Sequence, residues 1–271
     1  MDEVNKTLYI PLYGKAKVSK QGIILHDPMA EKIWEAEAFS IKGRSGSKWL
    51  AYNMAMRARV FDDWTDSMIS KNKSAIVLQI GCGLDSRCLR VKQAYKRWID
   101  CDFPEVIALR KKYYAENEKY SMRAFDASNP DQVRQLPDAE AAIVVLEGIS
   151  MYLTSEQLSH FFDALHRKYT SLHILMDIYT KFGARASRIK NPVNEVGVGK
   201  VYGIDDMEKV IGGLGIREKR EYSLTPGRLV NELKGFDKLI FKVLFTGRLY
   251  RKIYRLFELD AMDETDRREK A

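Results

Sequence analysis

The spacing of apolar residues along the chain changes near residue 70. Before that point apolar positions recur every three or four residues, at 29–39 and again at 49–67, which predicts two helices. Gly43 and Gly46 indicate the loop between them. Residues 1–70 contain no alternation long enough to indicate a strand, so they are predicted to form a helical N-terminal extension that contributes to the cofactor site.

From residue 71 onward, short apolar runs alternate with amphipathic stretches. Strands are predicted at 75–80, 97–101, 120–125, 141–147, 171–177 and 216–223. Helices are predicted at 85–94, 104–117, 155–169 and 205–214, with a short one after Asn129-Pro130 and a capping box formed by Thr154 and Gln157. This alternation predicts an α/β fold over residues 71–223, with a doubly wound, mostly parallel sheet of the seven-stranded type.

Two segments do not fit the alternation. Residues 178–202 are irregular and glycine-containing, and we expect a loop or lid on the substrate side, because long loops in compact domains are usually functional or disordered. Residues 224–271 are basic, with eight lysines and arginines between Arg228 and Arg255 against two acids. Apolar residues at helical spacing within 228–257 favour helices packed on the core with a solvated basic face. A membrane or nucleic-acid surface is the alternative.

The first predicted strand ends in a glycine turn. Gly81 and Gly83 follow the apolar run, and such residues allow the backbone to pass close beneath a ligand. Asp85 and Ser86 can then begin the next helix. A strand, a glycine turn and a helix start together form a cradle for a nucleotide-type cofactor.

Acidic residues follow the next three predicted strands. Asp102 lies about 20 residues after the first glycine, where a carboxylate accepts hydrogen bonds from a ribose. It could instead cap the helix that opens at Phe103-Pro104. Asp126 follows the third strand and Glu147 the fourth. Because a desolvated carboxylate is costly without a cation, Glu147 is expected to lie beside a positively charged cofactor.

These features distinguish S-adenosylmethionine from a dinucleotide. Ser86 replaces the third glycine of the dinucleotide fingerprint, and Asp85 places a negative charge where a pyrophosphate would otherwise bind. Acids at successive strand ends suit a sulfonium cofactor. S-adenosylmethionine is therefore the predicted cofactor, and an NAD-linked oxidoreductase remains an alternative.

Several motifs together resemble the leucine carboxyl methyltransferase family, and within it the bacterial branch of tetracenomycin-type polyketide O-methyltransferases. They are PLYGKA at 11–16, HDPMA at 26–30, RARVFDD at 57–63, GCGLDSR at 81–87, DFPEV at 102–106, LEG at 146–148 and MYL at 151–153. The likeness covers roughly the first two thirds of the chain, and the motifs are specific as a set.

The resemblance implies how the cofactor is held. Arg59 would bind its carboxylate, with Lys15 as a second cation and Arg57 as the competing register. Asp126 would contact the adenine beside the Ala127 backbone, unless it serves only as a turn cap. The cofactor-binding residues expected in all are Lys15, Arg59, Gly81, Cys82, Gly83, Asp102, Phe103, Asp126, Ala127, Glu147 and Gly148.

The predicted reaction is methyl transfer to an oxygen of a small carboxylic acid or phenolic metabolite, of which a polyketide is one candidate. No His–acid pair suggests a general base, and Tyr152 could orient the acceptor or merely pack. The Asn/Asp-Pro-Pro-Tyr motif that receives a base amino group is absent, which argues against a nucleic-acid partner. The alternative acceptor implied by the resemblance is the C-terminal leucine carboxylate of a protein phosphatase subunit.

Composition agrees with an enzyme of the cytoplasm. The three cysteines have no disulfide-scaffold spacing, and the four histidines are scattered without metal-ligand spacing, so no metal is expected. The first residues lack the plan of a signal peptide, and no apolar run approaches ~20 residues, so no membrane insertion is expected. The net charge of +8 keeps a non-catalytic, membrane-associated binding module as a further alternative.

Overall fold

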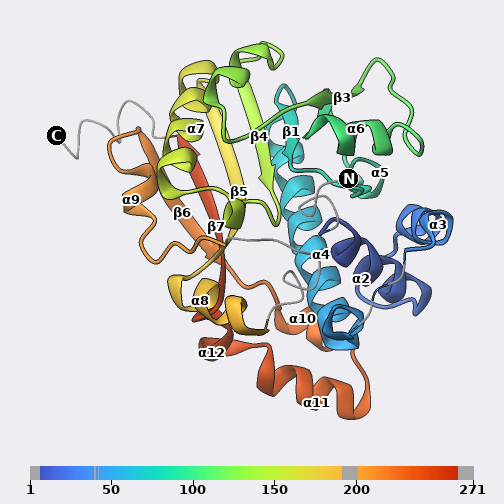
Figure 1. The fold of residues 1–271 in the computed structure, drawn as a ribbon. Helices are drawn as coiled ribbons and strands as arrows, with labels where there is room; N and C mark the ends of the chain where they lie inside the picture. Colours follow the sequence, from blue (N-terminus) through green and yellow to red (C-terminus); the bar gives the residue numbers. More distant parts are fainter. Residues whose placement is uncertain (1–6, 40, 42, 191–200, 262–271) are drawn as a thin grey trace.

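The computed structural model describes residues 7–39, 41, 43–190 and 201–261, and its centre is a seven-stranded sheet (Figure 1). The strands are β1 (Ile76–Ile80), β2 (Arg97–Asp102), β3 (Tyr120–Ala124), β4 (Ala141–Leu146), β5 (Ser171–Tyr179), β6 (Ile216–Tyr222) and β7 (Tyr254–Ala261). Their order is β3-β2-β1-β4-β5-β7-β6. Neighbouring strands from β3 to β5 pair in parallel, whereas β7 is antiparallel to both β5 and β6. The predicted doubly wound, mostly parallel sheet is confirmed.

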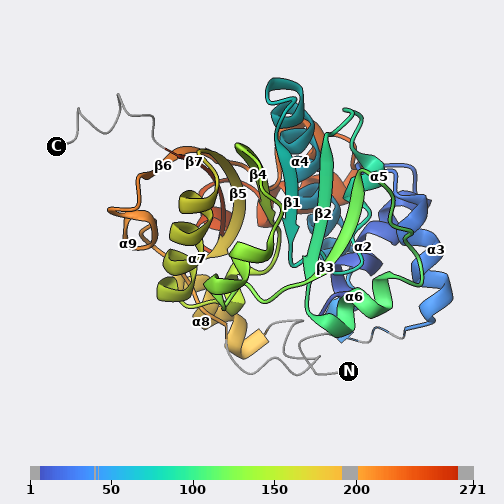
Figure 2. The same cartoon turned by 90° about the horizontal axis from the view of Figure 1, so that it is seen from above.

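Helices cover both faces of this sheet (Figure 2). One face carries α4 (Lys48–Lys71), against which α2 (Tyr9–Lys20) packs, with α3 (Pro28–Glu37) beyond it. The other carries α7 (Ser155–Lys168) and α9 (Glu208–Ile211). Alternate strand residues enter the two cores: Val77 packs in the α4 core and Leu78 in the α7 core. Because both faces are covered, β1 is buried along its whole length.

Several helices are shorter than predicted. The helix expected at 85–94 is only α5 (Arg87–Arg90), because the backbone amides of Lys92 and Gln93 donate to the Asp66 carboxylate at 2.8 and 3.0 Å. The helix expected at 104–117 is α6 (Pro104–Arg110), and the one expected at 205–214 is α9. Short 3-10 turns occur at η1 (Gly43–Gly46), η2 (Pro130–Gln135) and η3 (Ser150–Tyr152). The predicted capping box at the start of α7 is present.

The C-terminal region differs most from the prediction of a wholly helical segment. It contains α10 (Gly227–Val230), α11 (Gly235–Leu244) and α12 (Gly247–Arg251), but residues 254–261 form β7, which lies between β5 and the edge strand β6. Leu256, Phe257 and Leu259 are buried because both faces of the sheet are covered here, and the adjacent apolar pair Leu256-Phe257 interrupts the apolar–polar alternation that identifies a strand.

The expected substrate-side loop at 178–202 is also partly helical. Strand β5 continues to Tyr179 and α8 (Lys181–Lys190) follows it, while 191–200 lie outside the described residues, as do 262–271. The N- and C-terminal segments meet at the lower edge of the molecule in Figure 1, where Asp237 of α11 accepts hydrogen bonds from Lys48 (2.8 Å) and Tyr52 (3.0 Å). Among the described residues, no helix is long and apolar enough to cross a membrane.

Candidate active site

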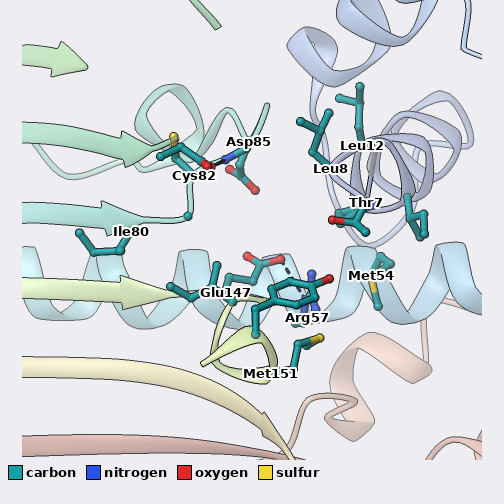
Figure 3. A pocket seen from close by; sticks show the side chains of 18 of the residues that line it. Thr7, Leu8, Leu12, Met54, Arg57, Ile80, Cys82, Asp85, Glu147 and Met151 are labelled. Carbon is teal, nitrogen blue, oxygen red and sulfur yellow. Dashed lines mark hydrogen bonds and ion pairs between the residues drawn. The ribbon is translucent and has the colours of Figure 1, made fainter. Parts of the chain in front are cut away.

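A cavity of about 820 Å³ lies at the carboxyl ends of the parallel strands. Its volume is near the upper end of the range of about 300–1,000 Å³ for small-molecule sites, enough for more than a single small ligand. Figure 3 shows Cys82 and Asp85 on one wall, Glu147 beside Arg57, and Thr7, Leu8 and Leu12 across from them. We call the wall formed by residues 79–85, 102–103, 106, 125–128 and 147–148 the strand-tip side. The wall formed by Trp49, Leu50, Asn53, Tyr179, Phe245, Tyr250 and Ile253 is the aromatic side.

The glycine turn after β1 forms part of the strand-tip side. Gly81 and Gly83 have φ values of +68° and +51°, in the left-handed region that favours glycine. A Cβ on Gly81 would lie 2.0 Å from Cγ2 of Ile149, so no other residue fits there unless the Ile149 side chain or the backbone shifts. Cys82 also lines the cavity, and burial raises the pKa of its thiol well above the usual value, so the thiol stays protonated.

Asp102, at the end of β2, performs a structural task while lining the cavity. Its carboxylate accepts hydrogen bonds from the backbone amides of Gly83 (2.7 Å) and Phe103 (2.8 Å), so it ties the glycine turn to the start of α6. Each carboxylate oxygen retains acceptor capacity for a ligand hydroxyl. Burial raises the pKa of Asp102 to about 6. Phe103 is 39% exposed and also lines the cavity.

The segment after β3 also combines a structural role with a position at the cavity. Asp126 and Ala127 both line the cavity. Asp126 also closes a turn, because its carboxylate accepts from the Ser128 amide (2.8 Å) while its own amide donates to Gln132 (2.8 Å). The turn role and a position at the cavity therefore coexist in one side chain, as they do in Asp102.

A buried ionic network lies where the two sides of the cavity meet. Arg57 donates to Glu147 (Nε to Oε1, 3.0 Å) and lies 3.2 Å from Asp177, and Arg87 also pairs with Glu147. Lys15 pairs with Asp85. Burial alone would raise the pKa of Glu147, but the two arginines lower it below its usual value.

The sequence analysis assigned the cation beside Glu147 to the cofactor and did not foresee these arginines. The protein supplies two guanidinium groups of its own, because a carboxylate this deeply buried must already be paired before any ligand arrives. Gly148 has a φ of +75°, and its backbone amide donates a hydrogen bond to the Asp177 carboxylate (2.7 Å). A Cβ at this position would lie 3.3 Å from the Arg57 guanidinium.

Arg59 does not lie at the cavity, contrary to prediction; the competing register, Arg57, does. Arg59 donates to Asp63 (2.9 Å) and to the carbonyl oxygen of Ile24 (3.2 Å) at a partly exposed position. Two residues along an α-helix rotate a side chain by about 200°, so these two arginines point to opposite faces of α4. The sequence does carry an indication of the correct register, because Trp49, Asn53 and Arg57 recur every four residues and all line the cavity.

The aromatic side combines segments far apart in the chain, and the sequence did not identify it. The Phe245 ring lies 6.5 Å from Trp49 and 6.4 Å from Tyr250, measured between ring centroids. The Tyr250 hydroxyl donates to Oδ1 of Asn53 (2.9 Å), and within the described part of the chain the buried Nδ2 of Asn53 has no hydrogen-bond partner. Tyr152 lines the cavity too, and burial raises the pKa of its phenol.

Comparison with known sequences gives a consistent result. Residues 11–166 match the family model described as leucine carboxyl methyltransferase. The tetracenomycin polyketide synthesis O-methyltransferase TcmP of Streptomyces glaucescens is 24% identical over 88% of this chain and 89% of its own length. An S-adenosyl-L-methionine-dependent methyltransferase of Gibberella zeae, dpfgK, is 28% identical over 56% of this chain and 57% of its own.

Solved structures show the same fold. The magnesium protoporphyrin IX methyltransferase of Synechocystis PCC 6803 with bound SAH superposes with a TM-score of 0.52 at 11% identity, covering 96% of this chain and 99% of that one. The same enzyme with bound SAM gives a TM-score of 0.51, again covering 96% of this chain and 97% of the other.

Proposed function

Since the chain belongs to the leucine carboxyl methyltransferase family and is an S-adenosylmethionine-dependent methyltransferase, we propose that it methylates a carboxylate or phenolic oxygen of a small, largely apolar metabolite. The observation that carries this proposal is the division of one cavity into a charged strand-tip side and an aromatic side. The first suits the methyl donor and the second suits an apolar acceptor.

The strand-tip side has groups suited to each part of the cofactor. Asp102 would accept hydrogen bonds from the ribose hydroxyls, and the apolar side chains of Ile80, Val106 and Phe125 would surround the adenosine, near Asp126 and Ala127. Lys15 and Arg57 would share their charge between the network and the cofactor carboxylate. Glu147 would attract its ammonium group.

When bound, S-adenosylmethionine supplies a methyl group on a positively charged sulfur. The protein's part is to align the acceptor oxygen with that methyl and to exclude water, since opposite charges are neutralised during transfer. Among the described residues that line the cavity there is no histidine, and the carboxylate of Glu147 is held by two arginines. The site therefore favours an acceptor that is already anionic, or a phenol of lowered pKa, over one that needs a general base.

The other acceptor within the family, a protein's C-terminal leucine carboxylate, is less consistent with the aromatic side of the cavity. Trp49, Phe245 and Tyr250 line the cavity with aromatic rings, whose surface suits an aromatic acceptor better than an aliphatic leucine. Tyr152 would border the acceptor beside Met151.

Transfer of a labelled methyl group tests the proposal. The protein is incubated with methyl-labelled S-adenosylmethionine and one acceptor at a time: an aromatic carboxylic acid, a phenol, an aromatic amine, or a peptide with a C-terminal leucine. We expect label on the acid or phenol, with base-labile esters distinguished from stable ethers. Label only on the amine or only on the peptide would overturn the proposed acceptor class, and calorimetric titration with S-adenosylhomocysteine confirms that each preparation binds cofactor.

A further inference from the structure

The outer face of α11 and α12 carries a cluster of exposed apolar side chains. Phe236 is 72% exposed, Leu239 59%, Val243 63%, Leu244 60% and Leu249 68%. Within the described residues, these five outnumber all other exposed large apolar side chains together. Phe236, Leu239 and Val243 lie at positions i, i+3 and i+7 of α11, so they share one face of the helix. We call these five residues the hairpin patch.

The exposed face that carries the hairpin patch is not the face by which α11 packs on the rest of the protein. The inward side of α11 carries the buried Phe241, which contacts the Tyr52 ring, and Phe245, which lines the cavity. Asp237 anchors the helix to α4 through Lys48 and Tyr52. The apolar outer face is thus additional to what folding requires, and exposed apolar clusters of this kind mark interaction sites.

Basic residues surround the hairpin patch. Residues 234–252 contain six lysines and arginines, namely Lys234, Lys238, Lys242, Arg248, Arg251 and Lys252. The single acid in this segment is Asp237, whose carboxylate already binds Lys48. Lys242, Arg248, Arg251 and Lys252 are all exposed, and of these Arg251 forms an ion pair with Glu221. In Figure 1 the two helices form the lower edge of the molecule, where a flat surface could approach them.

We propose that the hairpin patch and its basic rim dock on an anionic lipid surface. An interfacial helix inserts Leu, Phe and Val side chains at the boundary of headgroups and acyl chains while Lys and Arg bind lipid phosphates, and both parts are present here. A second copy of the chain fits less well, because a symmetric contact through this face would oppose two basic rims with almost no acid between them. The docking places the aromatic side of the cavity, formed in part by Phe245 and Tyr250, next to the membrane.

Vesicle sedimentation tests the docking without any methyl acceptor, so its result is independent of the proposed reaction. The full chain is mixed with vesicles of phosphatidylcholine alone or of equal parts phosphatidylcholine and phosphatidylglycerol, at 50 and 500 mM NaCl. Each basic residue near an anionic surface is worth about fivefold in binding. We therefore expect binding to the anionic vesicles at low salt and a loss of at least about tenfold at high salt or without phosphatidylglycerol.

Paired variants assign the binding to this surface. Lys242→Glu with Arg248→Glu should weaken binding at least about tenfold, and Leu239→Ser with Val243→Ser at least about fivefold. Lys96→Glu with Lys119→Glu, which changes the net charge equally before β2 and β3, should remain within about twofold of the unmodified protein. All variants alter exposed residues, and thermal melts verify their folding.

Three results would overturn the inference. The first is no binding to anionic vesicles at low salt. The second is equal loss in the Lys96/Lys119 control, which would indicate only general charge attraction. The third is a dimer, detected by light scattering, that dissociates in the Leu239/Val243 variant while vesicle binding stays absent.

Discussion

The two sides of the cavity differ in how the chain builds them. The strand-tip side consists of residues at or just after the carboxyl ends of β1 to β4, so parallel strands bring them to one edge of the sheet. The aromatic side combines α4 with residues about 200 positions later, including Phe245 and Tyr250. A local motif can encode the first side, whereas the second exists only once α11, α12 and β7 have been placed. We therefore expect changes on the first side to affect cofactor affinity and changes on the second to affect the acceptor.

The largest effect is expected from Arg57→Met. Removing this guanidinium leaves Glu147 with Arg87 alone and removes a cation from Asp177, and breaking a buried ion pair costs about 3 kcal/mol of unfolding free energy. We also expect S-adenosylhomocysteine to bind about 100-fold more weakly, as measured by calorimetry.

Arg59→Met is the matched control for this change, two residues along the same helix. Its ion pair with Asp63 is partly exposed, so we expect less than about 1 kcal/mol and less than about a threefold change in affinity. Equal losses of affinity in the two variants would show that the two arginines are not divided between cavity and surface.

An intermediate effect is expected from Trp49→Ala on the aromatic side. Loss of its ring removes contact area for the acceptor, so the acceptor KM should rise about tenfold while cofactor affinity stays within about twofold. Trp34→Ala is the control, because Trp34 is also half-buried but packs at a tilt against Tyr13, and neither residue lines the cavity. A loss of cofactor affinity in Trp49→Ala would contradict the assignment of cofactor binding to the strand-tip side and acceptor binding to the aromatic side.

The smallest effect concerns pH. With its pKa at about 6, Asp102 becomes protonated as pH falls from 7.5 to 5, and since a neutral carboxyl keeps part of its acceptor capacity, cofactor affinity should decrease only about fivefold over this interval. Asp102→Asn should bind more weakly at pH 7.5 but with a flatter pH profile. An unchanged slope in this variant would assign the titration to another group.

Stability should change in the opposite direction. Because the folded-state pKa of Asp102 lies above its ordinary value near 3.8, the folded protein binds the proton more readily than the unfolded chain. This contribution to stability is present at low pH and is lost as pH rises through about 6. Comparison of denaturant midpoints of the unmodified protein and Asp102→Asn isolates it.

The elements predicted most accurately were those with a local cause. The glycine turn and the capping box of α7 each depend on neighbouring residues, and the structure contains both. The helix at 85–94 was too long because Asp66, distant in sequence, captures the amides that end α5. Strand β7 was missed because the adjacent pair Leu256-Phe257 interrupts its alternation and extends the helical spacing of the apolar residues before it.

The sequence by itself determined the parallel strands, the glycine turn and the acids at the strand ends, because backbone conformation is set over short stretches of chain. Only the tertiary structure decided which arginine of α4 reaches the cavity, how Glu147 is neutralised, and which aromatic rings form the opposite wall. Those outcomes depend on the rotation of one helix and on the packing of segments far apart in sequence, where a shift of two residues exchanges a buried contact for an exposed one.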